Sequence, residues 1–344
     1  MERRPLPLRS PYTIAYETVS AAENVFVRIV TDGPHVGLGA AGPDAEVTGE
    51  TIDACEASLR TLVDRLPGED PLRRSALLAG FEGAGPAARA ALDMALLDLL
   101  GKRAGLPVWR LLGAARACMP TSVTVFIDEP EHMVSRSKAL VAKGFGALKL
   151  KGGRDPERDA AMVRAVRAAV GPSVDLRFDA NQGYSEEQAL RFLDGVAQAD
   201  LEVLEQPTPR GHGDVLRRVS EASDVPVMAD ESLVDLADAF RLARGGLAHM
   251  VNIKLMKVGG IEAALTVNAV ARAAGMEVMV GCMDESALAI AAGLHFALAR
   301  PNVQLADLDA HLDLLDDPAE GAVRLEGGVL WPADGPGFGV VDLG

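Results

Sequence analysis

The chain has 344 residues, of which 49% are apolar and 24% are charged, so it can bury a large globular core. Its net charge of −15 at pH 7 argues against nucleic acid or an anionic membrane as partner, because both need a basic face. Three widely spaced cysteines predict a reducing compartment, and no apolar stretch suggests a secretion signal or a membrane span. We therefore expect a cytoplasmic enzyme or binding protein.

The first part of the chain shows no repeat. Residues 12–19, 24–30 and 35–43 are rich in β-branched residues or bounded by turn residues, and they predict three strands. A helix is predicted for 85–105, where Pro86 suits the first helical position and leucines recur on one face.

From Thr121 onward a strand-and-helix unit recurs. Each short apolar stretch ends in a polar residue and precedes an alanine-rich amphipathic segment, and the ends lie 24 to 28 residues apart. With 121–128 as a first strand there are eight such units, which predict a parallel (β/α)8-type barrel whose eighth unit can be modified. The later strands end at Lys151, Asp179, Glu205, Asp230, Lys254, Cys282 and Asp307.

Three consecutive strand ends are acidic. The carboxyl ends of barrel strands surround the active site, so Asp179, Glu205 and Asp230 are expected to converge. A cation relieves their repulsion, and an all-oxygen ligand set suits Mg²⁺. One such acid alone could equally be a helix N-cap, but three in register favour a metal site.

Lysines flank these acids. Lys149 and Lys151 lie two apart on one strand and so share a face, and Lys254 comes from the far side of the barrel. A desolvated lysine beside other cations is expected to have its pKa lowered to roughly 7–8 and to act as a base, although a strand-end lysine can also extend into solvent.

This combination indicates proton abstraction next to a substrate carboxylate. Mg²⁺ on that carboxylate, with Lys149 beside it, would spread the developing negative charge. Lys151 on one face and Lys254 on the other would remove and return the proton, which inverts the carbon.

These motifs resemble a known family. "KLK" (149–151), the three spaced acids, "NIKLMKVGG" (252–260) and the helix at 91–113 are similar to the muconate-lactonizing branch of the enolase superfamily. The resemblance covers almost the whole chain and implies an α/β fold, a modified (β/α)7β TIM-type barrel with an α+β capping domain.

The resemblance also implies the division of the chain and the roles of its site residues. The capping domain would be residues 1–117, the barrel 118–315, and a C-terminal segment, 316–344, of loop and short strand would pack back on the cap. Asp179, Glu205 and Asp230 would hold Mg²⁺, and Lys151 and Lys254 would be the acid/base pair. Asn181 and Glu231 match supporting positions, where Glu231 could hold Lys254 and Asn181 could equally be a turn residue.

Several reactions share these residues in that branch. They include lactone-forming cycloisomerisation of the muconate type, dehydration to o-succinylbenzoate, N-acylamino acid racemisation and dipeptide epimerisation. Asp307 and Asp309 lie two apart at the last strand end, where two carboxylates can hold a free α-ammonium group. This pair and "GCMDES" (281–286) are most like the dipeptide epimerases, although a solvated acidic turn is the alternative. An inactive barrel kept as a scaffold is disfavoured because no lysine or acid of the set is lost.

The second residue of the dipeptide is less constrained. The resemblance implies that an arginine in the mobile cap loop selects Glu, but the corresponding "IAYETVS" (14–20) holds Tyr16 and Glu17 and no arginine. We therefore expect a hydrophobic or cationic rather than an acidic second residue, with Glu17 favouring the cationic option if it points inward. The sequence leaves homo-oligomerisation open.

Overall fold

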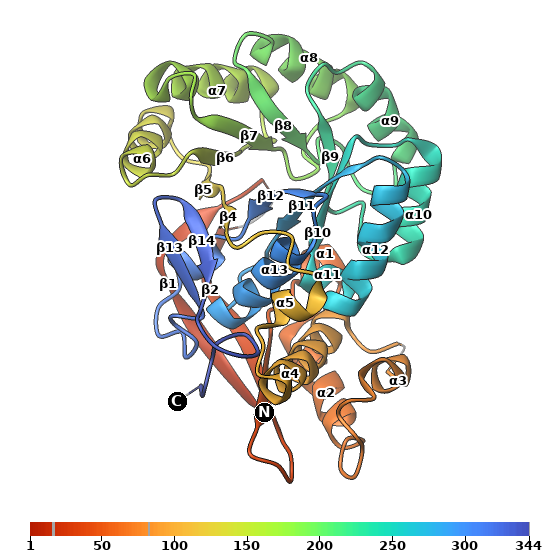
Figure 1. The fold of residues 1–344 in the computed structure, drawn as a ribbon. Coiled ribbons are helices and arrows are strands. Elements are labelled where there is room, and N and C mark those ends of the chain that lie inside the picture. The colour runs from red at the N-terminus through yellow and green to blue at the C-terminus, as the bar shows by residue number, and fades with distance from the viewer. Residues whose placement is uncertain (16–17, 82, 344) are drawn as a thin grey trace.

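A computed structural model describes residues 1–15, 18–81 and 83–343. The N-terminal part contains an antiparallel sheet of three strands in the order β1-β2-β3 and a group of helices beside it (Figure 1). The strands are β1 (Glu2–Thr13), β2 (Thr18–Val30) and β3 (Val36–Ala41). The helices are α1 (Ala45–Thr48), α2 (Ile52–Val63), α3 (Arg74–Ala79), α4 (Pro86–Ala104) and α5 (Val108–Leu112).

The predicted helix at 85–105 is confirmed as α4. Pro86 is its first residue, and Gly105 ends it with φ of 67°, a conformation that costs glycine little. Helix α4 packs closely on β3, where a Cβ added at Gly39 would lie 1.9 Å from the Ala91 carbonyl oxygen. The glycines of β3 therefore allow the helix to approach the sheet.

The first strand differs from its prediction. We expected a strand at 12–19, whereas β1 ends at Thr13 and β2 begins at Thr18. Strand β1 contains three prolines, which usually argue against a strand, but it is an edge strand of its sheet and tolerates them.

The larger part of the chain contains an eight-stranded parallel sheet, in which neighbouring strands follow one another in the sequence. This arrangement confirms the predicted barrel. The backbone N–H of Ser122 donates to the Ala306 carbonyl at 3.0 Å, which links the first strand to the last. The strands are β5 (Val123–Val125), β6 (Ala147–Lys151), β7 (Asp175–Asp179), β8 (Leu201–Glu205), β9 (Val227–Ala229), β10 (Met250–Lys254), β11 (Glu277–Gly281) and β12 (Val303–Asp307).

Helices surround this sheet and connect its strands (Figure 1). They are α6 (Pro130–Ala142), α7 (Pro156–Val170), α8 (Glu186–Val196), α9 (Gly213–Glu221), α10 (Leu236–Gly245), α11 (Leu255–Val258), α12 (Ile261–Ala273) and α13 (Ala287–Ala299). A short 3₁₀ helix, η1 (Ala310–Leu312), follows β12 in place of an α-helix, so the barrel is of the predicted (β/α)7β type.

Strand register aligns the polar strand ends. Lys151 pairs with Asp179, and Asp179 pairs with Glu205. On the other side, Lys254 pairs with Gly281, which pairs with Asp307. The polar side chains at these strand ends therefore leave the sheet at one level.

The C-terminal segment contains a hairpin rather than one short strand. Strands β13 (Val323–Glu326) and β14 (Val329–Pro332) pair with each other and with β4 (Met119–Pro120). Gly327 and Gly328 between them both have positive φ, which suits a two-residue turn. The N–H of Phe338 further along donates to Asp98 of α4 at 3.0 Å, so the segment contacts the N-terminal part.

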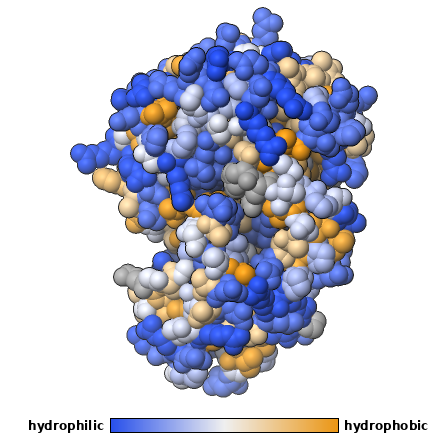
Figure 2. All heavy atoms as spheres, turned by 180° about the vertical axis from the view of Figure 1, so that it is seen from behind, coloured by the Kyte–Doolittle hydropathy of each residue, from blue (hydrophilic) through white to orange (hydrophobic). Residues whose placement is uncertain are grey.

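Surface hydropathy is mixed. On the face shown in Figure 2, apolar residues form separate patches among hydrophilic ones. In the described ranges, no helix combines the length and apolarity needed to cross a bilayer.

Candidate active site

The three predicted metal ligands lie together. Asp179 and Glu205 end β7 and β8, Asp230 directly follows β9, and each offers an oxygen within 4.8 Å of the others. All three are buried, and none caps a helix: the N-caps of α8, α9 and α10 are Ser185, His212 and Asp235. The N-cap alternative therefore does not apply, and three carboxylates suit a hard divalent cation.

The local charge balance also fits a cation. Burial and the charge of Asp179 raise the pKa of Glu205 to about 8, and burial with the charge of Asp230 raises the pKa of Glu231 to about 7. One oxygen of Glu231, Oε2, is buried and has no hydrogen-bond partner among the described residues. A Mg²⁺ ion held by the triad would stabilise the ionised forms.

Lys149 shows why two lysines are tolerated side by side. Its side chain is 2% exposed, and its Nζ lies 3.1 Å from Asp179, 2.8 Å from Glu205 and 2.9 Å from Asp307. The ammonium group is thus paired with carboxylates from three strands. This pairing compensates for the cost of burying the charge.

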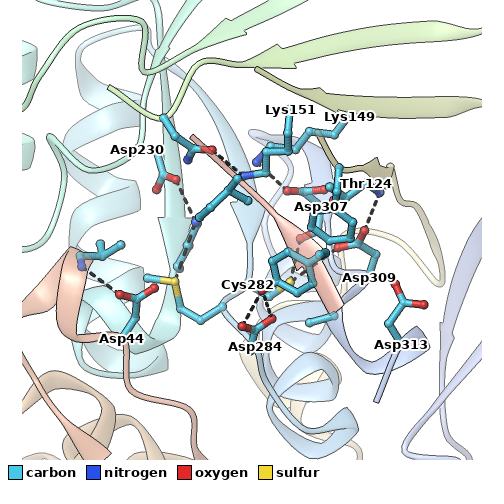
Figure 3. A pocket seen from close by; sticks show the side chains of 18 of the residues that line it. Asp44, Thr124, Lys149, Lys151, Asp230, Cys282, Asp284, Asp307, Asp309 and Asp313 are labelled. Atoms are coloured by element: carbon cyan, nitrogen blue, oxygen red, sulfur yellow. Dashed lines mark hydrogen bonds and ion pairs between the residues drawn. The ribbon is translucent and has the colours of Figure 1, made fainter. Parts of the chain in front are cut away.

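Lys151 and Lys254 lie on opposite walls. They end β6 and β10, which are four strands apart in the eight-stranded order. Lys151 Nζ lies 2.7 Å from Asp179, and Lys254 Nζ lies 2.8 Å from Asp230. Both line one cavity at the carboxyl ends of the strands, together with the acidic residues labelled in Figure 3.

One expectation about the lysines is not met in this structure. Burial lowers the pKa of Lys254, but Asp230 and Glu205 outweigh burial and raise it well above its usual value. Lys149 behaves in the same way. Burial and the neighbouring cations favour lowered values, but the carboxylates outweigh both. A divalent cation on the triad would oppose this effect, because it adds positive charge beside the lysines.

Residues in and next to β5 and β6 hold Asp307 and Asp309 in place. Asp307 accepts hydrogen bonds from Ser122 Oγ at 2.7 Å and Lys149 Nζ at 2.9 Å. Asp309 accepts the backbone N–H of Thr124 at 2.7 Å, and burial with the charge of Asp307 raises its pKa to about 7. Both line the cavity (Figure 3), which does not fit a solvated acidic turn.

The supporting residues form a different contact from the expected one. Asn181 accepts from Lys151 Nζ at 3.1 Å and donates to Glu231 at 3.3 Å, so it is more than a turn residue. The carboxylate that contacts Lys254 is that of Asp230, whereas Glu231 contacts Asn181. The predicted cap-loop residues Tyr16 and Glu17 lie outside the described residues.

Sequence reasoning missed two residues that contact the acidic triad. Lys257 of α11 is buried and donates to the carbonyl of Asp230 at 2.6 Å and to its carboxylate. Asn252 donates to Glu205 at 2.9 Å. The signal for Lys257 was present: it is a lysine within the otherwise apolar "LMKV" that follows Lys254.

A capped (β/α)7β barrel with an acidic triad and opposed lysines defines a class of enzymes that remove a proton next to a carboxylate. The chain belongs to the mandelate racemase/muconate lactonizing enzyme family of enolase-like proteins. The family's N-terminal domain model matches residues 2–113, and the enolase C-terminal domain-like model matches residues 132–341.

Individual relatives cover nearly the whole chain. The chain is 42% identical to the L-Lys-D/L-Arg epimerase of Methylococcus capsulatus, covering 97% of this chain and 96% of that protein. It is 36% identical to the L-Ala-D/L-Glu epimerase of Bacillus subtilis, covering 98% and 94%. The Enterococcus faecalis dipeptide epimerase, solved with Mg and L-Leu-L-Tyr, matches with a TM-score of 0.97 at 36% identity, covering 99% and 98%.

Proposed function

We propose that the protein is a Mg²⁺-dependent dipeptide epimerase that inverts the α-carbon of the second residue of an L,L-dipeptide. The observation that carries this proposal is the placement of Lys151 and Lys254 on opposite walls of one cavity, four strands apart. The names of two relatives with different substrates, L-Lys-D/L-Arg and L-Ala-D/L-Glu epimerase, support the same chemistry.

The residues divide the reaction between them. Bound Mg²⁺ would supply positive charge that stabilises the negative charge developing on the substrate carboxylate. One lysine, in its neutral form, takes the α-proton, and the C–H electron pair remains on the substrate. The other lysine donates a proton from its Nζ to the opposite face, so the configuration inverts. Lys149 adds a buried positive charge beside the triad.

Asp307 and Asp309 supply the feature that distinguishes a dipeptide from an N-acylated amino acid. Asp307 is already engaged by Lys149 and Ser122, so Asp309 would carry most of the contact with the α-ammonium group. An N-acyl substrate has no such ammonium and would leave this carboxylate unpaired in the cavity. The dipeptide assignment follows from this charge match.

The second residue is proposed to be hydrophobic or cationic. Among the described residues that line the cavity there is no arginine, and the cavity carries Asp313 in addition to the carboxylates near the lysines. An acidic side chain would face this negative charge without a fixed partner. We also infer a cytoplasmic location, supported by the acidic net charge and by three cysteines that form no disulfide.

The test is deuterium incorporation. The Mg²⁺-loaded enzyme is incubated in D₂O with a library of L-Ala-L-Xaa dipeptides and with the matching N-acetyl amino acids. We expect α-deuteration of the second residue in dipeptides with neutral or basic Xaa, and little in the N-acetyl compounds. Equal exchange of N-acetyl amino acids would contradict the dipeptide assignment, and preferential exchange of L-Ala-L-Glu would contradict the side-chain assignment.

A further inference from the structure

We infer that Asp44 and Asp284 form a subsite for a cationic side chain, Lys or Arg, on the first residue of the dipeptide. We call these two residues the acidic subsite. The inference rests on the proposed function and adds the chemistry of the residue that is not epimerised.

The two carboxylates come from different parts of the fold and line one cavity. Asp284 follows β11, and the Tyr12 hydroxyl from β1 donates to it at 2.6–2.7 Å. Asp44 is the N-cap of α1, where one oxygen accepts the Val47 N–H at 2.9 Å. Both line the cavity that contains Lys151 and Lys254. Figure 3 shows Asp44 on the side away from Asp309, with Asp284 between the two.

The charges in the cavity do not balance without a further cation. Each of the three cavity lysines has a carboxylate partner within 3.1 Å. Asp44, Asp284 and Asp313 also line the cavity, and none of the three forms an ion pair with a described residue. A dipeptide's α-ammonium group would pair with Asp309, and its carboxylate would be neutralised at the metal triad. Burial and the nearby charge of Asp44 raise the pKa of Asp284, and a second positive charge on the substrate would relieve the repulsion between these two carboxylates.

Strand order indicates which substrate residue the acidic subsite meets. Lys254 ends β10, Asp284 follows β11, and Asp309 follows β12, and these strands are neighbours in that order. In the proposed reaction one face of the α-carbon would contact Lys254, and the ammonium group would lie beside Asp309. The first residue joins these two points, so its side chain starts in the β11 sector.

The cavity wall in this sector suits the stem of a long basic side chain. Met283 directly precedes Asp284, and Val47, whose N–H donates to Asp44, also lines the cavity. Lys and Arg need apolar surface for their methylene groups and a carboxylate for the charged end. Methionine adapts its shape to such a stem. Apolar walls that lead to Asp44 and Asp284 provide both requirements.

The test compares L-Lys-L-Ala with L-Met-L-Ala, whose first side chain has similar length and no charge. The ratio of their kcat/KM values is measured by α-deuteration of alanine for the wild type, Asp284→Asn and Asp44→Asn. Asp194→Asn, at an exposed position on α8, makes the same charge change outside the cavity and serves as control. We expect the wild type to prefer L-Lys-L-Ala, each cavity variant to reduce the ratio by about tenfold or more, and the control to keep it.

Asp284→Lys provides a second measurement that a folding defect cannot imitate. This variant is expected to shift the preference toward L-Glu-L-Ala. A wild type that prefers L-Met-L-Ala, or cavity variants that keep the wild-type ratio, would overturn the subsite while leaving the epimerase proposal intact. A preference for L-Ala-L-Lys over L-Lys-L-Ala would overturn the assignment to the first residue. If the enzyme deuterated none of the dipeptides, the proposed function itself would be rejected.

Discussion

Replacing Lys257 by methionine tests a contact on which the acidic triad depends. Its Nζ donates to the Asp230 carboxylate, to the Asp230 carbonyl at 2.6 Å and to the Asn252 carbonyl at 3.0 Å. The side chain is fully buried, and methionine matches its length without its charge. The substitution therefore removes three hydrogen bonds while it leaves the packing nearly unchanged.

The magnitude follows from what remains around Asp230. Removing one partner of a buried ion pair costs roughly 3–5 kcal/mol, because the other charge is left unpaired. Asp230 keeps Lys254 at 2.8 Å, and the protein no longer has to bury the Lys257 ammonium group, whose pKa burial lowers. Both effects favour the lower end of the range, so we expect a loss of about 3 kcal/mol of unfolding free energy.

Urea unfolding without metal measures this loss, with Lys138→Met on the exposed face of α6 as control. Titration calorimetry with MgCl₂ alone measures a second consequence. Because Lys257 holds Asp230, a proposed metal ligand, we expect Mg²⁺ affinity to fall by roughly 10–100-fold. A variant with less than about 1 kcal/mol of destabilisation and unchanged Mg²⁺ affinity would refute the reasoning, since losses of that size are ordinary for neutral hydrogen bonds.

Three further predictions concern the metal, the ammonium contact and acid stability. Removal of Mg²⁺ with EDTA should stop α-deuteration, and full exchange in EDTA would contradict the metal assignment. Mg²⁺ at about 100 times its Kd should add about 2.7 kcal/mol of unfolding free energy. The pKa of Asp309 is raised to about 7, so wild-type kcat/KM for L-Ala-L-Ala should rise as pH passes through 7 and the carboxylate ionises. Asp309→Asn should lose this inflection and raise KM about tenfold, and an unchanged profile would count against the contact. Burial lowers the pKa of His295 to about 3. The unfolded chain therefore binds a proton at this residue below about pH 6.5, whereas the folded protein does not. The free energy of unfolding should fall as the pH drops from about 6.5 toward 3. Between pH 7.5 and 5.0 the wild type should lose about 2 kcal/mol more than His295→Gln in urea unfolding, and equal losses would show that His295 is protonated in the folded state.

The barrel and the polar ends of its strands could be predicted because both follow from local pattern. Apolar stretches ending in Lys151, Asp179 or Glu205 recur at nearly constant spacing, and parallel register then brings such ends to one level. The same pattern predicts Lys151 and Lys254 on opposite walls, because three strands of a closed eight-stranded sheet lie between theirs.

Contacts that depend on packing between distant segments could not be predicted in this way. Tyr12 and Asp284 are 272 residues apart, and only the docking of the cap on the barrel brings them together. The choice of Asp230 rather than Glu231 as the partner of Lys254 depends on side-chain directions after β9. The spacing of residues along the sequence does not show side-chain directions or contacts between distant segments.

The central claim is that Lys151 and Lys254 act on opposite faces of the same α-carbon. Single replacements by methionine, Lys151→Met and Lys254→Met, are incubated with Mg²⁺ in D₂O with each pure epimer of one dipeptide, and α-deuteration is followed by NMR. We expect each variant to exchange one epimer without inverting it, and the two variants to retain opposite epimers. If both variants exchanged the same epimer, or if either still interconverted the two, the bases would not face each other across the substrate.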